Sequence, residues 1–124
     1  METRSEREAS YFPREALILQ PDVAGARMWG VALDKAVLTY FEVEPHCRFE
    51  RHHHESEQIT MVLEGELFFE LDGATFCVRQ GDVIAIPSDV PHAVFTQDTH
   101  VKAVDAWSPV MQQFLRPKEQ RGAS

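Results

Sequence analysis

The chain has 124 residues, and its formal net charge is −8, from 20 acidic and 12 basic residues. This length suits one domain, and the acidic balance, with no cluster of Lys and Arg, argues against nucleic acid and anionic membranes as partners. No apolar run approaches the ~20 residues that cross a bilayer, and the charged N-terminus lacks the apolar core of a signal peptide. Cys47 and Cys77 are too few for a disulfide framework, so we expect a cytoplasmic protein.

Short apolar segments separated by turn residues follow one another along the chain. Strand patterns fill residues 26–33, 36–44, 58–78, 79–96 and 100–109. The turn signals between or within them are Asp34-Lys35, Glu64-Gly65, Asp72-Gly73 and Gln80-Gly81-Asp82. No helical pattern of 10 to 15 residues lies between the strands. The sequence therefore predicts an all-β sandwich or barrel rather than a parallel α/β sheet.

The two ends of the chain differ from this strand-rich centre. Residues 1–15 are charged and have no clear period, so we expect a flexible arm. Residues 110–117 are the only stretch that fits a short helix or a docked tail. We place the barrel domain at residues 16–115 and a C-terminal tail at residues 116–124.

Three consecutive histidines are the most conspicuous candidates for chemistry. Side chains alternate between the two faces of a strand, so His52 and His54 point one way and His53 points the other. After a polar bend a new strand starts near Gln58, and His92 opens another strand after Pro91. Three imidazoles and one amide oxygen can then converge on a metal ion. The spacing alone does not bring His92 to His52, and a solvated polar bend is the alternative.

Two segments resemble the two sequence motifs of the cupin family. The first motif corresponds to His52, His54, Gln58 and Gly65, and the second to Gly81, Pro87 and His92. Asp89 replaces a frequent glycine of the second motif, and Thr96 replaces a frequent asparagine; neither change removes a ligand. The resemblance covers roughly residues 36 to 107. It implies an all-β, single-domain cupin, a double-stranded β-helix or jelly-roll barrel.

The resemblance also implies a metal site formed by His52, His54, Gln58 and His92. Many cupins have glutamate where this chain has Gln58, and a neutral amide leaves more of the cation's charge uncompensated. Glu57 should face away from the site if Gln58 faces in. Three imidazoles and one oxygen suit a single divalent transition metal: zinc, iron, nickel, manganese or copper.

Asp105 is the candidate proton-transfer residue. Strand alternation places it on one face with Val101, Ala103 and Trp107. A carboxylate among apolar neighbours needs a partner, which a metal or a substrate can supply, and such a group suits general acid–base catalysis. The alternative is that Asp105 faces solvent or pairs with a basic side chain.

The end of the barrel resembles the small cupins of pectin and alginate degradation. Those proteins open the ring of 4,5-unsaturated uronates. The matching residues are Asp105, Trp107, Ser108, Pro109, Phe114 and Leu115. Met111 stands where that family has an arginine, and methionine cannot bind a substrate carboxylate bidentately.

Two classes of function remain open from the sequence. The first is a metal-dependent enzyme acting on a small oxygenated substrate such as a sugar acid, by ring opening, isomerisation or, for a diol or enol, dioxygenation. The second is a non-catalytic barrel that binds a small ligand; a purely structural metal is a third possibility. By analogy with the fold, we expect a homodimer.

Overall fold

The computed structural model describes residues 8–111, and its regular elements are one short 3-10 helix and ten strands. The all-β prediction is confirmed, with strands at the predicted segments. The elements are η1 (Arg14–Ala16), β1 (Gln20–Pro21), β2 (Ala26–Ala32), β3 (Val37–Val43), β4 (Arg48–His52), β5 (Glu57–Glu64), β6 (Glu66–Leu71), β7 (Ala74–Arg79), β8 (Val83–Ile86), β9 (His92–Thr96) and β10 (Val101–Ser108).

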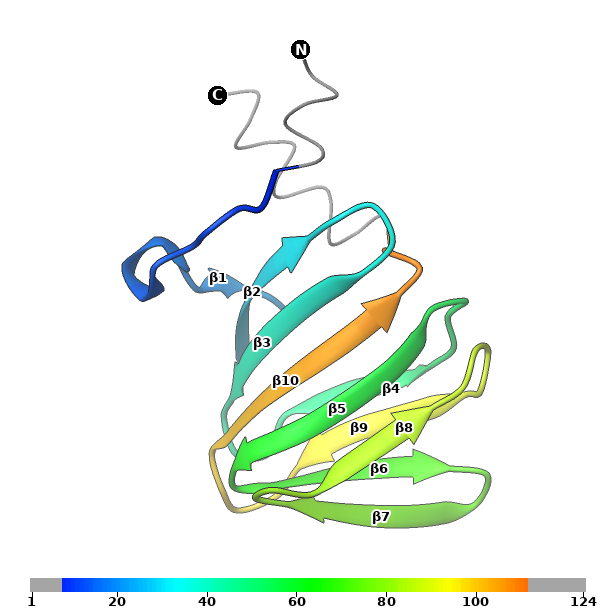
Figure 1. Cartoon of the computed structure of the whole chain (residues 1–124). Coiled ribbons are helices and arrows are strands. Elements are labelled where there is room, and N and C mark those ends of the chain that lie inside the picture. The colour runs from blue at the N-terminus through cyan, green and yellow to red at the C-terminus, as the bar shows by residue number, and fades with distance from the viewer. Residues whose placement is uncertain (1–7, 112–124) are drawn as a thin grey trace.

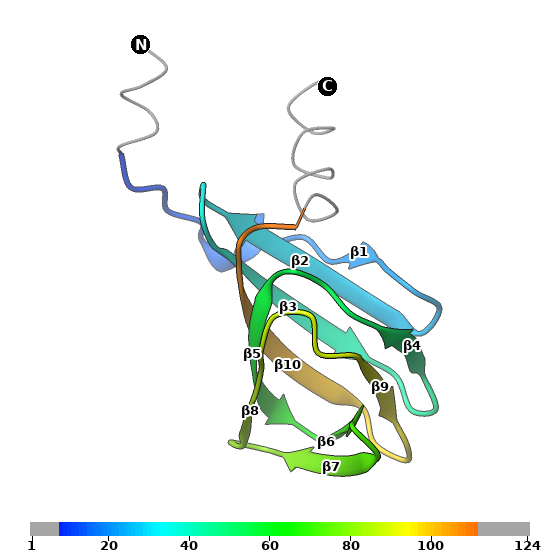
Figure 2. The ribbon, with the colours of Figure 1, turned by 90° about the vertical axis from the view of Figure 1, so that its right-hand side faces the viewer.

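Two antiparallel sheets face each other to form the barrel (Figures 1 and 2). The larger sheet has the strand order β1-β2-β3-β10-β5-β8, and the smaller sheet has the order β4-β9-β6-β7. The last strand of the described residues, β10, lies between β3 and β5, near the centre of the larger sheet. Strands that are distant in sequence therefore become neighbours in both sheets.

The tight turns occur where the sequence predicts them. The β2–β3 hairpin closes with a hydrogen bond of 2.9 Å from the Leu33 amide to the Ala36 carbonyl. Gly65, between β5 and β6, has a φ of 86°, and a Cβ at this position would collide with the carbonyl oxygen of His100. Only glycine combines this backbone conformation with so close an approach of another chain segment.

The core lies between the sheets. It is formed by the alternation of inward, buried side chains with outward, more exposed ones along the strands. In β5 and β10 every second side chain is buried, which is the period of two that a half-buried strand imposes. Val62, Phe69 and Val101 are each no more than 1% exposed. Burying one such side chain contributes about 1.5–3 kcal/mol. The same inward face also carries polar residues, namely Thr39, Gln58, Thr60 and Asp105.

Part of the outward face of the larger sheet is apolar. Strand pairing aligns two rows of outward side chains across it: Val31, Leu38, Ala106, Ile59 and Ala85 in one row, and Trp29, Tyr40, Val104, Met61 and Val83 in the other. Ile59 and Val83 are each more than half exposed. Antiparallel sheets usually present polar side chains on the solvated face, so this patch is suited to contact with another surface.

Phe68, by contrast, does not stand alone on the outside of the smaller sheet. Its ring stacks on that of Phe95, with centroids 5.2 Å apart and planes 12° apart. The Arg48 guanidinium lies 5.6 Å from the centroid of the Phe95 ring. The stacked pair explains why Phe68 is only partly exposed.

The two ends of the chain are only partly described. The predicted tail at residues 116–124, and Phe114 and Leu115 of the resemblance, lie outside the described residues. The domain boundaries therefore stay predictions. No helix among residues 8–111 has the length and apolar character needed to span a membrane. Both cysteines in the described part are free thiols.

Candidate metal centre

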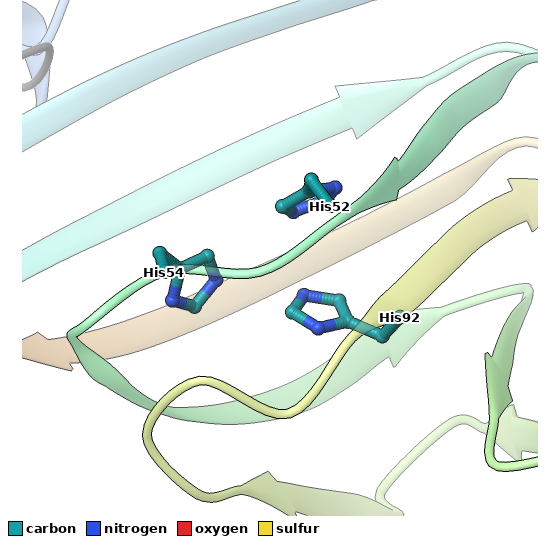
Figure 3. A group of neighbouring side chains, drawn as sticks. All are labelled: His52, His54 and His92. Atoms are coloured by element: carbon teal, nitrogen blue, oxygen red, sulfur yellow. The ribbon is translucent and has the colours of Figure 1, made fainter.

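Three histidines from two paired strands converge at one end of the barrel (Figure 3). His52 is the last residue of β4, His54 lies two residues beyond it, and His92 is the first residue of β9. The two strands pair antiparallel, with His52 directly opposite His92. One ring nitrogen from each histidine lies within 4.8 Å of the other two. The predicted convergence of the three imidazoles is confirmed, and the strand pairing supplies the long-range contact that the sequence spacing left open.

Backbone carbonyls fix which nitrogen of each imidazole is free. Each Nδ1 lies at hydrogen-bond distance from a carbonyl oxygen two residues away. A carbonyl can only accept, so in each neutral imidazole Nδ1 carries the proton and Nε2 keeps a lone pair. This second contact is the usual way in which proteins orient metal-binding histidines. The pairs are His52 with Glu50 at 2.7 Å, His54 with Ser56 at 2.8 Å and His92 with Val90 at 2.8 Å.

Three buried polar atoms at this end of the barrel have no hydrogen-bond partner within the described chain. They are Nε2 of His54, Nε2 of His92 and Oε1 of Gln58. Leaving one such acceptor unpaired costs about 1–3 kcal/mol. All three are lone-pair donors of the kinds that divalent transition metals bind. The residues present therefore fit a metal ion, which would satisfy these acceptors together.

Gln58 reaches this point from the other sheet, and its amide group is oriented by a neighbour. Its side chain is buried on β5, and its Nε2 donates a 2.9 Å hydrogen bond to the hydroxyl of Thr60. With the amide nitrogen engaged there, the oxygen remains as the unpaired atom. The sequence did not single out Thr60 as a site residue, although the alternation of side chains along the strand places it on the same face as Gln58. Glu57 is exposed, as predicted.

Asp105 is buried beside the cluster and is held by hydroxyl groups. Only 5% of the residue is exposed, so the alternative of a solvent-facing carboxylate is wrong. Thr39 donates a hydrogen bond of 3.3 Å to one carboxylate oxygen, and the Thr60 hydroxyl donates a short hydrogen bond to the other. The Trp107 indole N–H donates in turn to Thr39, at 2.7 Å. The one signal in the sequence for Thr39 and Thr60 is that each is a polar residue at an inward-facing position of its strand.

Burial changes the proton affinity of two groups in the site. Desolvation raises the pKa of Asp105 to about 6, against the opposing effect of the hydrogen bonds from Thr60, Thr39 and Gln58. The carboxyl group can therefore both take and return a proton near neutral pH. Desolvation lowers the pKa of His92, and the nearby imidazoles of His52 and His54 lower it further. A neutral His92 retains the lone pair that a metal needs.

A cavity opens beside the histidines. Its polar lining consists of His52, Gln58, His92 and Asp105. Most of the remaining wall is apolar and includes Phe41, Phe49, Leu67, Phe69, Val94 and Trp107. No Lys or Arg of residues 8–111 lines it. His53 lies outside the site, two-thirds exposed, with its Nδ1 3.6 Å from a carboxylate oxygen of Asp89.

The buried carboxyl group predicts a distinctive pH dependence for the stability of the metal-free protein. Because the folded-state pKa of Asp105, about 6, is raised above the ordinary 3.8, its stabilising contribution is complete below the ordinary value and is lost as the pH rises through 6. Between about pH 4.5 and about pH 7.5, wild type should lose about 2 kcal/mol more than Asp105→Asn. Urea unfolding at both pH values measures this difference. Parallel pH profiles for the two proteins would contradict it.

Comparison with known proteins agrees with this architecture. Residues 39–107 match the Cupin domain family. No curated protein matches the chain. Among solved structures, KdgF from Halomonas sp. is 22% identical with a TM-score of 0.80, covering 87% of this chain and 100% of its own. An RmlC-like cupin from Shewanella frigidimarina is 19% identical with a TM-score of 0.79, covering 86% and 96%. The polyketide cyclase RemF from Streptomyces resistomycificus is 26% identical with a TM-score of 0.70, covering 82% and 80%.

Proposed function

This chain belongs to the cupin family, and on that premise we propose that it is a metal-dependent enzyme acting on a small oxygenated molecule. The observation that carries the proposal is the cluster of unpaired buried acceptors beside a buried carboxyl group, with Gln58, His92 and Asp105 all lining one cavity. A purely structural site would not need an adjoining cavity with a proton-accepting group in its wall.

The proposed ligands are His52, His54, Gln58 and His92, and the proposed cofactor is one divalent transition metal: zinc, iron, nickel, manganese or copper. When bound, such an ion acts as a Lewis acid that polarises a substrate carbonyl or hydroxyl. The chain's own contribution is a set of four neutral ligands oriented by the Nδ1 contacts and by Thr60. Asp105 then carries the negative charge of the site.

Asp105 is proposed as the group that moves a proton. Its carboxylate takes a proton from the carbon next to a substrate carbonyl. The electrons of the broken C–H bond form a C=C bond, and the carbonyl π electrons move to the oxygen. The resulting carboxylic acid returns the proton to another atom of the substrate, which completes an isomerisation. Thr39 and Thr60 hold the carboxyl group in place throughout.

Two sets of observations favour different substrates. The resemblance of the chain's end favours ring opening of unsaturated uronates. Met111 stands in place of the expected arginine, and no basic side chain of the described chain lines the cavity. The likeness to RemF, a polyketide cyclase, supports a carbonyl compound other than a sugar acid.

Metal analysis of the purified protein tests the proposal directly. We expect about one equivalent of a transition metal per chain, and a higher unfolding temperature after the metal-free protein is reloaded. Saturation at a thousandfold above the Kd stabilises a protein by about 4 kcal/mol. Failure to bind any of the five metals would reject the proposal. Metal binding without turnover of uronates, catechols or diketones would instead support a ligand-binding barrel.

The expected homodimer also remains a proposal. The apolar outward face of the larger sheet, with Ile59, Met61 and Val83 exposed, supports self-association through this face. Sedimentation equilibrium would show twice the chain mass for wild type, and a shift toward the monomer for Met61→Lys. A wild-type monomer at all concentrations would exclude the homodimer.

A further inference from the structure

The two hydroxyl groups that contact Asp105 have their hydrogen bonds supplied by the protein itself. The Thr60 hydroxyl donates to Asp105 and accepts from Gln58. The Thr39 hydroxyl likewise donates to Asp105 and accepts from Trp107. Neither threonine has a proton left to donate to a ligand. Once the proposed metal ligands are engaged, Asp105 is the polar lining group that remains for a substrate.

This shortage of partners is unfavourable for a sugar acid. Each buried hydroxyl without a hydrogen bond costs about 1–3 kcal/mol, and a uronate carries several hydroxyls. Its carboxylate would find the proposed metal as its cation, with no second cation to hold it in place, because the cavity lining contains no Lys or Arg within residues 8–111. The carboxylate of Asp105 in the same wall would repel it. These effects reduce the affinity for a polyhydroxylated anion.

The rest of the cavity lining is apolar and rich in aromatic rings. The rings of Phe41 and Phe49 pack edge to face, with centroids 6.1 Å apart and planes at 88°. Leu67, Phe69 and Val94 continue this wall, and Trp107 lines the same cavity. Burial of apolar area contributes about 25 cal/mol per Å², and aromatic rings prefer such edge and face contacts. A planar apolar ring therefore gains most from this wall.

From this lining we infer that the substrate is a mostly apolar, planar carbonyl compound with one oxygen-bearing end, such as an aryl β-diketone. The oxygen-bearing end lies toward the histidines, and the ring lies against Phe41 and Phe49. The inference rests on the proposed metal centre, because it assigns the polar lining to the metal. It extends the proposed function by selecting one substrate class.

Binding of matched ligands to the zinc-loaded full chain tests the inference. Benzoylacetone and acetylacetone share the same diketone, and only the first has a ring. We expect benzoylacetone to bind at least about tenfold tighter than acetylacetone and than galacturonate, as measured by calorimetry. Zinc content measured after each titration controls for removal of the metal by the diketone.

A pair of phenylalanine variants locates the ring. Phe49→Ala should reduce the preference for benzoylacetone over acetylacetone about tenfold, while zinc affinity stays unchanged. Phe68→Ala, which removes a ring from the outside of the barrel, should preserve the preference. If Phe49→Ala does not fold, the ligand ratios of wild type still decide the question.

The outcomes separate the inference from the proposed function. If wild type binds no zinc, both fail. If it binds zinc but favours galacturonate, or shows no preference between the two diketones, the inference alone is overturned. An unchanged ligand preference in folded Phe49→Ala would overturn the assigned position of the ring.

Discussion

Replacing His92 with alanine should weaken zinc binding by more than about 100-fold, because changes in groups that merely orient a ligand already cost ~10–100-fold. His92 is 1% exposed, and its Nε2 is one of the unpaired buried acceptors. No other side chain of the described strands occupies its position opposite His52. Competition against a coloured chelator measures the dissociation constant for zinc.

His53→Ala is the matched control for this experiment. His53 belongs to the same run of histidines, but it is exposed and lies beside Asp89 outside the cluster. Its removal should leave the zinc affinity unchanged. If His92→Ala does not fold, His54→Ala tests the same cluster. Equal affinities for wild type and a folded cluster variant would show that these imidazoles do not hold the metal.

Replacing Asp105 with asparagine should reduce turnover by about 10²- to 10⁴-fold, the usual contribution of a positioned acid–base group. Asparagine has nearly the same shape, and its amide oxygen can still accept a hydrogen bond from Thr39 or Thr60. It cannot take a proton from a substrate. Zinc affinity should therefore stay close to that of wild type while kcat falls.

Asp98→Asn provides the corresponding control, because the Asp98 side chain is 88% exposed. This variant should retain both turnover and zinc affinity. Undiminished turnover in Asp105→Asn would remove Asp105 from the mechanism. Loss of zinc together with turnover would assign it a role in holding the metal centre instead. Measuring kcat, KM and metal content on the same samples distinguishes these results.

Local features of the fold were accessible from the sequence alone. Alternating apolar residues determine strands, because side chains of period two can bury one face. Asp72-Gly73 and Gly65 determine turns, because glycine adopts positive φ at little cost. The spacing of His52 and His54 indicated that their side chains point to the same side of the strand. The strand and turn patterns predicted the all-β class. The two motifs that resemble the cupin family implied the jelly-roll barrel.

Only the tertiary structure decided which strands are neighbours. Alternation tells which side chains share a face of one strand, but it carries no information on the pairing of distant strands. The pairing of β4 with β9 brings His92 opposite His52. The position of β10 between β3 and β5 places Asp105 between Thr39 and Thr60. These contacts depend on the register between distant strands. For that reason, only the assembled sheets show that Asp105 is buried, that the Thr39 and Thr60 hydroxyls donate hydrogen bonds to it, and that most of the cavity lining is apolar.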